Sequence, residues 1–177
     1  INSVSGNLVK LGDVAENLDN LRVPVAAGKR KEGIYPYYGA SGIVDYVDSW
    51  VIDDYVLLIS EDGANLKTRN TPIAFTVIGK AWVNNHAHIL KFRNKSTHRF
   101  VELYLNHLDL SNFITGQAQP KLSQNNMNQI RIPLPSLDQQ KEIVACIEIH
   151  EQQITQAQQI IDTASAQKQS ILNKYLN

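Results

Sequence analysis

The last third of the chain carries apolar residues at the spacing of an amphipathic helix. Between Ser136 and Asn177 there is no Gly or Pro, so nothing interrupts a helix there. Apolar and small residues recur at alternating steps of four and three, which is the heptad seam of a coiled coil. The seam consists of Ile143, Ile147, His150, Ile154, Ala157, Ile161, Ala164, Lys168, Ile171 and Tyr175. At about 1.5 Å per residue such a helix is on the order of 60 Å long, so we expect it to extend beyond a small domain and to need a partner.

Two polar residues, His150 and Lys168, interrupt this seam. Polar seam residues fix the register or the partner of a coiled coil at some cost in stability, although His150 could equally be a partly exposed edge residue. Small alanines at the other seam positions allow close approach of either a parallel or an antiparallel helix. Ser136 can cap the helix, and Gln139 three residues later would complete a capping box.

The part of the chain that precedes the helix, residues 7–135, favours short strands. The apolar run Val51–Ile59 is typical of a buried strand, with Asp53 and Asp54 expected as a break or bulge. Further β-rich runs are Ile73–Ile78 and Ala87–Phe92.

Turns and one short helix complete this region. Gly79 and the pair Asn84-Asn85 are expected turn residues between strands. Thr97–Leu108 has the apolar spacing of a short helix, with Ser96 or Thr97 as its cap. The sequence therefore predicts an α+β or twisted β domain over residues 1–135, followed by one long helix over residues 136–177.

Composition limits the class of protein. The 177 residues suffice for one domain plus an appendage, and hydrophobic residues make up 43% of the chain. No apolar run approaches the roughly 18 residues of a membrane span, and no basic-then-apolar leader is seen, so secretion is not expected. Cys146 is the single cysteine, which excludes an internal disulfide and favours a reducing cytoplasm.

Charge is balanced overall but uneven locally. Lys plus Arg and Asp plus Glu both total 17. Residues 21–40 carry four basic residues against one acid, and residues 79–103 carry five against one. Such patches could serve a polyanion, although ordinary solvated surface gives the same pattern.

The sequence offers little catalytic or metal-binding chemistry. It has no phosphate-cradling glycine loop, no cysteine pair at zinc spacing and no Asn-Pro-Pro-Tyr type base-methylation motif. His86 and His88 on one strand would share a face, yet no third metal ligand is evident. The two acidic pairs at 53–54 and 61–62, with Lys67, resemble a nuclease cluster only loosely. We therefore expect no catalytic residue, no metal and no cofactor in this chain.

Three polar segments have the composition of DNA-contacting loops. Arg and Lys can bind phosphates or guanine edges, and Asn and Gln can pair with adenine. The candidate DNA-binding residues are Lys29, Arg30, Lys31 and Tyr37 in the first segment, Asn65, Lys67, Arg69 and Asn70 in the second, and Gln117, Gln119, Lys121, Ser123 and Asn125 in the third. We expect the second and third segments to read bases, with Arg69 as a guanine reader. Gly39 and Gly42 are expected to form a tight turn rather than a contact.

The order of several motifs resembles a known family. The chain reads LVKLGDVAE, then YPYYGASGIVDYVDSW, YVLLISEDGA and WVNNHAHIL, and finally GQAQPKLSQNNMNQIRIPLPSLDQQKEIV. This order, from about Leu8 to Leu176, resembles one half of the specificity subunit of a type I restriction-modification enzyme. The resemblance is to a target recognition domain followed by its long helix.

This resemblance implies a non-catalytic subunit that reads double-stranded DNA. In the family, two recognition domains each read half of a bipartite target, and two antiparallel helices separate them and bind the modification subunits. Those subunits bring S-adenosylmethionine and methylate adenine, and the restriction subunit joins indirectly.

The present sequence departs from that plan because it carries one recognition domain and one helix. It is therefore either part of a longer subunit or a half-subunit that forms a homodimer and reads an interrupted palindrome. The competing interpretation is a protein-interaction module on a coiled-coil arm, in which the basic loops are mere surface.

Overall fold

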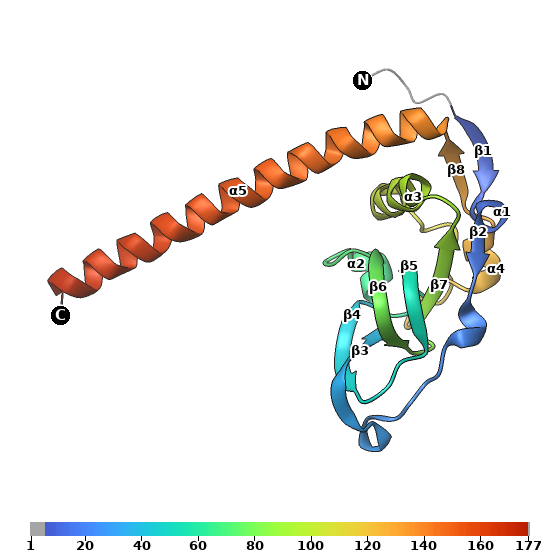
Figure 1. The fold of residues 1–177 in the computed structure, drawn as a ribbon, viewed down its shortest axis with the longest axis horizontal. Helices are drawn as coiled ribbons and strands as arrows, with labels where there is room; N and C mark the ends of the chain where they lie inside the picture. The colour runs from blue at the N-terminus through green and yellow to red at the C-terminus, as the bar shows by residue number, and fades with distance from the viewer. Residues whose placement is uncertain (1–5, 177) are drawn as a thin grey trace. The chain divides into compact units, whose positions relative to one another are not determined.

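The computed structural model describes residues 6–176, which fall into two compact units. The first unit ends at Leu137 and the second begins at Asp138. The first unit mixes strands with short helices and the second is one long helix (Figure 1). The α+β class predicted from the sequence is confirmed. Within residues 6–176 no helix has both the length and the apolar character needed to cross a membrane.

A six-stranded sheet forms the framework of the first unit. Its strand order is β2-β7-β5-β6-β3-β4, and every pairing is antiparallel except that of β3 with β6. The strands are β2 (Ala15–Asn17), β3 (Glu32–Gly39), β4 (Gly42–Val47), β5 (Ile52–Ser60), β6 (Ala74–Val83) and β7 (Ala87–Phe92). The predicted strand at Ala87–Phe92 is confirmed at both ends.

The central strand β5 is buried on both faces, which explains why apolar residues follow one another along it without alternation. Four consecutive residues, Val56 to Ile59, are fully buried. One face joins a cluster with Val77, Ala81 and Ile89 from the two neighbouring strands. A continuous apolar run of this kind is typical of a strand with no solvent-facing side.

Two details of the strand prediction were wrong. Asp53 and Asp54 do not break β5, because they stay in register with Lys80 and Gly79 of β6. The carboxylate of Asp54 instead forms an ion pair with Lys91. Gly79 lies inside β6 rather than in a turn, and its φ of +80° is one that glycine adopts without a steric penalty.

The helix α3 (Lys95–His107) begins two residues earlier than the sequence predicted. Its N-cap position is Asn94, so neither Ser96 nor Thr97 caps it, and the Asn94 side chain makes no capping hydrogen bond. The buried residues Phe100, Val101 and Leu105 give α3 the apolar face that the spacing predicted.

The hairpin of β3 and β4 turns at the glycines expected to form a tight turn. Gly39 and Gly42 are the last paired residues of the two strands, and Gly42 has a φ of +125°. The hydroxyl of Ser60 donates to the carbonyl of Ala40 inside this turn, which links the hairpin to the end of β5.

A second, two-stranded sheet joins the ends of the first unit. It pairs β1 (Asn7–Lys10) with β8 (Arg131–Leu134) in antiparallel register. The short elements around the sheets are α1 (Leu11–Val14), η1 (Asp19–Leu21), η2 (Ala27–Lys29), α2 (Asn65–Thr68) and α4 (Gln124–Asn128).

The helix α5 (Leu137–Leu176) makes up the second unit from Asp138 onward, and the predicted long helix is thereby confirmed. Its 40 residues correspond to about 60 Å at 1.5 Å per residue. Every residue from Glu148 to Leu176 is exposed, including Ile154 and Tyr175 of the predicted seam at 69% and 73%. The helix therefore presents a row of uncovered apolar side chains to solvent.

Candidate nucleic-acid interface

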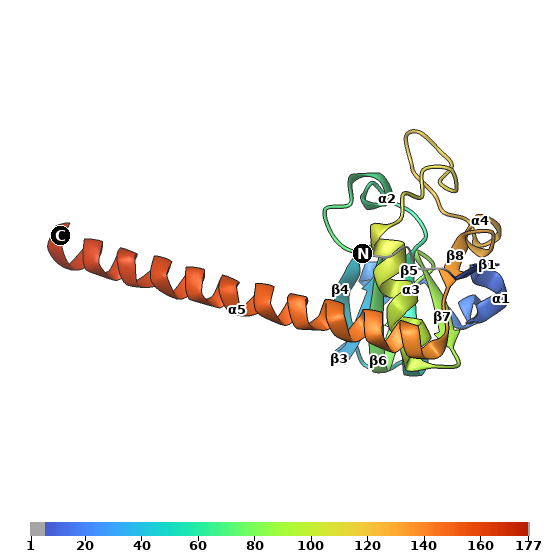
Figure 2. The same ribbon diagram turned by 90° about the horizontal axis from the view of Figure 1, so that it is seen from above.

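Two of the three predicted contact segments lie side by side and are joined through their main chains. The amide of Gly63 donates to the carbonyl of Pro120 at 3.1 Å, and the amide of Leu122 donates to the carbonyl of Glu61 at 2.7 Å. Asp62 and Lys121 form an antiparallel bridge between these bonds. Figure 2 shows the loop that carries α2 and the segment before α4 on the same side of the first unit. We call residues 61–71 the α2 loop and residues 115–125 the α4-proximal segment.

The α2 loop is closed by its own side chains. The amide group of Asn65 donates to the carbonyl of Thr71 at 3.0 Å and accepts from the amide of Thr71 at 3.1 Å. The ammonium of Lys67 donates to the carbonyl of Gly116 at 3.2 Å, which adds a third connection to the α4-proximal segment. Asn70 is exposed at the end of this loop.

Arg69, the predicted guanine reader, is held against the protein itself. Its guanidinium donates to the carbonyls of Leu105 at 3.3 Å and Leu108 at 2.9 Å, at the C-terminal end of α3. Burial lowers the pKa of Arg69, and the nearby carboxylate of Asp109 opposes that effect. Its backbone is left-handed, with a φ of +52°. These contacts give Arg69 a structural role, and base reading by this residue stays a prediction.

The α4-proximal segment turns back on itself and exposes its amide side chains. Thr115 and Lys121 exchange two main-chain hydrogen bonds of 2.8 Å, so the residues between them form a tight excursion. Gly116 is required in it, because a Cβ atom there would lie 2.3 Å from the carbonyl oxygen of Gln119. Gln117 and Gln119 are exposed on this excursion.

The remaining predicted residues of this segment lie at the start of α4. The hydroxyl of Ser123 accepts from the amide of Asn126 at 3.3 Å, so Ser123 caps the helix. Asn125 is exposed on the first turn of α4.

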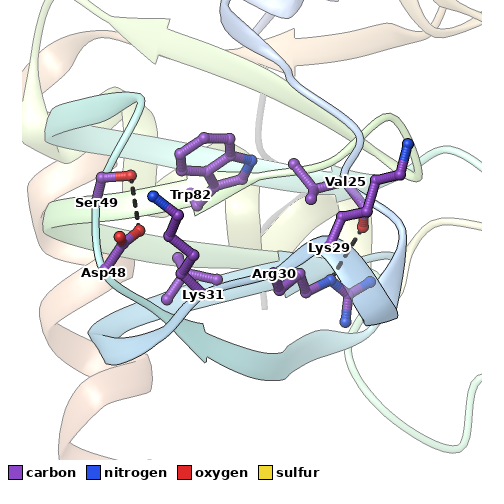
Figure 3. A pocket seen from close by; sticks show the side chains of 8 residues that line it. Val25, Lys29, Arg30, Lys31, Asp48, Ser49 and Trp82 are labelled. Carbon is purple, nitrogen blue, oxygen red and sulfur yellow. Dashed lines mark hydrogen bonds between the residues drawn. The ribbon is translucent and has the colours of Figure 1, made fainter.

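The first predicted segment, which contains Lys29 to Lys31, forms part of a separate basic cleft. Its volume is about 280 Å³, and Figure 3 shows the side chains that line it. The lining residues are Val25, Lys29, Arg30, Lys31, Val47, Asp48, Ser49 and Trp82. Lys29 and Lys31 are exposed, so their ammonium groups are open to an anionic partner.

Contacts within the protein hold Arg30 in the wall of this cleft and Tyr37 behind it. The guanidinium of Arg30 lies 4.3 Å above the ring of Tyr37, donates to the carbonyl of Val25, and pairs with Asp45 at 3.0 Å. The hydrogen bond from Arg30 to Asp45 lowers the pKa of this carboxylate. Tyr37 is 1% exposed and its ring stacks on Trp82, so Tyr37 shapes the cleft from inside the core and does not present its ring to solvent.

Both the sequence and the fold of this chain resemble those of known proteins. Residues 6–164 match the family model described as the type I restriction modification DNA specificity domain. This chain belongs to that family. A putative type I restriction enzyme specificity subunit from Haemophilus influenzae is 38% identical over 138 residues, which cover 78% of this chain and 35% of the relative.

Solved structures of specificity subunits share the fold of this family member. The S subunit of a type I restriction-modification system from M. genitalium superposes with a TM-score of 0.67 at 16% identity, over 96% of this chain and 45% of that one. The HsdS subunit from Thermoanaerobacter tengcongensis gives 0.58 at 18% identity, over 88% and 39%. This specificity domain with its helix thus spans less than half the length of these relatives.

Several residues of the specificity domain that sequence reasoning missed form a buried ionic cluster. Asp19, Glu61 and His88 place ligand-type atoms within 4.8 Å of one another. The guanidinium of Arg22 already lies between the two carboxylates, 2.5 Å from Glu61 and 3.3 Å from Asp19. The positive charge of Arg22 therefore balances part of the negative charge of the two carboxylates. His86 does not join this cluster, since it lies in the turn before β7 and pairs with Asp62.

Both carboxylates of this cluster are ionised in the folded domain. Burial alone would raise the pKa of Asp19 and of Glu61. The hydrogen bond from His88 to Asp19, and those from Arg22 and Lys121 to Glu61, outweigh burial, so both pKa values are lowered. No local sequence signal marks this cluster, because its members come from segments that lie far apart in the chain.

Proposed function

We propose that this chain reads one half of a bipartite DNA target for a type I restriction-modification enzyme and performs no catalysis itself. The observation that carries the proposal is the joining of the α2 loop to the α4-proximal segment, two segments that expose the amide side chains of Asn70, Gln117 and Gln119. Amide side chains of this kind pair with adenine edges in the major groove.

The basic cleft supplies the second part of the proposed contact. Lys29 and Lys31 would neutralise phosphates, which positions a duplex without reading its sequence. Each neutralised phosphate releases counterions, so binding should weaken steeply as salt rises. The family membership and the fold support this assignment, and a DNA partner implies that the protein acts in the cytoplasm, where bacterial DNA lies.

We infer that α5 pairs with a second such helix and binds the modification subunits. The exposed seam, with Ile154, Ile161 and Ile171 at 57–69%, supports a helical partner, because an apolar stripe of this length is costly to leave in water. Two copies of this chain would supply the two domains and two helices of the family plan. The second helix could equally come from the same polypeptide if the chain is part of a longer subunit.

Selection from a randomised duplex pool tests the proposal. The chain would be assembled with candidate modification subunits from the same host, and bound duplexes would be sequenced. An interrupted palindrome would establish a homodimeric reader, and a single half-site would indicate part of a two-domain subunit. A stable protein complex that enriches no sequence would refute DNA reading and favour a protein-interaction module.

A further inference from the structure

Glu61 occupies the point where the two candidate readout segments meet. It follows the last residue of β5 and begins the α2 loop. Its carbonyl accepts from the amide of Leu122 at 2.7 Å, and its amide donates to the carbonyl of His86 at 2.8 Å. Its carboxylate binds Lys121 at 3.0 Å through one oxygen and Arg22 at 2.5 Å through the other. Main chain and side chain of one residue thus hold the α4-proximal segment.

His88 holds the same segment from the neighbouring strand. It lies opposite Ile59 in the β5–β7 pairing, and its Nε2 is 2.8 Å from the carbonyl oxygen of Leu122. Its Nδ1 is 2.6 Å from the carboxylate of Asp19. The imidazole ring thus bridges the carboxylate of η1 and the main chain of the α4-proximal segment.

The peptide groups of Leu122 are therefore bound on both sides. Its N–H is held by Glu61 and its C=O by His88, while its side chain is fully buried. Lys121, one residue earlier, is the point at which the exposed excursion of Gln117 and Gln119 closes. Any movement of Leu122 would carry this excursion with it.

These anchoring groups are not available to touch a duplex. His88 is fully buried, and the side chain of Glu61 is 11% exposed with both oxygens occupied. A bidentate base contact needs side-chain atoms within hydrogen-bond distance of the base edge. Glu61 and His88 can influence readout only through the residues that they hold.

We propose that Glu61 and His88 are positioning residues for base readout. They fix the α4-proximal segment against the α2 loop, so that side chains of both segments meet the same stretch of groove. This inference rests on the proposed DNA-reading function. A positioning role and a role in folding alone affect the affinities for target and non-target duplexes differently. A smaller folded fraction lowers apparent affinity for every duplex equally, whereas a displaced readout segment lowers affinity only for the target.

The test measures the affinity of the chain, assembled with modification subunits, for its selected duplex and for a scrambled duplex at several salt concentrations. Glu61→Gln keeps the size of the side chain but removes its charge. We expect the ratio of target to scrambled affinity to fall at least tenfold, while scrambled-duplex affinity and its salt dependence change less than twofold. His88→Gln, which can reach only one of the two partners of the imidazole, should lower the same ratio.

Asp54→Asn is the matched control, because it is an acid-to-amide change in an ion pair of β5, the strand that precedes Glu61, and Asp54 belongs to neither segment. Its ratio should equal that of the wild type. If Glu61→Gln does not fold, Glu61→Asp keeps the charge, withdraws the carboxylate by one methylene, and should lower the ratio about threefold. An unchanged ratio in folded Glu61 and His88 variants would overturn the inference. Absence of sequence preference in the wild type would instead refute the proposed function, so the two failures are distinguishable.

Discussion

Replacement of Arg69 distinguishes a residue that reads DNA from one that holds the domain together. Its guanidinium makes hydrogen bonds of 3.3 and 2.9 Å to carbonyls at the end of α3. Carbonyls at a helix end lack partners within the helix, and the negative end of the helix dipole favours a cation there. A hydrogen bond to a charged group contributes about 1.5–3 kcal/mol when buried. Because Arg69 is only partly buried and one bond is long, we expect Arg69→Ala to lower the free energy of unfolding by about 1–2 kcal/mol.

The left-handed backbone of Arg69 sharpens this prediction. A non-glycine residue pays about 1 kcal/mol at a φ of +52°, and alanine keeps that strain while glycine relieves it. Arg69→Gly should therefore be roughly 1 kcal/mol less destabilising than Arg69→Ala. Urea denaturation followed by circular dichroism gives both free energies.

If Arg69 instead reads a base, its replacement should change the DNA sequence preference of the protein. Loss of a guanine-reading arginine lowers the binding free energy by about 1–3 kcal/mol. Duplex selection with the Arg69→Ala protein would then show no preference at one G·C position. The structural role predicts that the folded variant keeps a preference at every position of the site. Unchanged stability together with a collapse at one guanine would refute the structural assignment.

Three further changes test other parts of the molecule. His98 donates through Nε2 to the hydroxyl of Thr76, which itself donates to a carboxylate, and burial lowers the pKa of His98 from 6.5 to about 4. Between pH 6.5 and 4 the unfolded chain therefore binds one proton more than the folded chain at this residue. The free energy of unfolding should fall by about 1–3 kcal/mol over this range, after allowance for solvent screening. A charged His98 ring in the folded protein at pH 6, seen by nitrogen NMR, would contradict this prediction. If two copies pair through α5 as proposed, Ile161→Asp should weaken their association at least tenfold in analytical ultracentrifugation, whereas Gln159→Asp on the polar side of α5 should not. Equal effects of the two changes would show that the helices do not pair through the predicted seam. Lys31→Ala should lower affinity for all duplexes alike and reduce the salt slope by about one; loss of preference at particular bases would contradict a phosphate contact.

Elements with a local signal were predictable from the sequence. The helix α5 follows from its apolar spacing and from the lack of breakers, and the β3–β4 turn follows from Gly39 and Gly42. The error at Asp53 and Asp54 has a tertiary cause, since Lys91 and the register with β6 accommodate them within the strand. Local propensity cannot anticipate such long-range partners.

The candidate interface was predictable in its composition but only partly in its arrangement. Polar loop chemistry indicated the α2 loop and the α4-proximal segment, and the structure brings these two together. Residue type alone predicts Arg69 and Tyr37 as contact residues, whereas their contacts with α3 and Trp82 depend on the folded packing. The cluster around Glu61 and His88 was missed for the same reason.

Photochemical cross-linking would show which segments of the domain lie against the bases. A selected duplex with 5-iodouracil in place of thymine carries iodine where the methyl group projects into the major groove. After irradiation of the complex, mass spectrometry identifies the peptides joined to the base. If the α2 loop and the α4-proximal segment read the target, cross-links will fall within residues 61–71 and 115–125. Cross-links confined to other surfaces, such as β1 and β8, would contradict base reading by these segments.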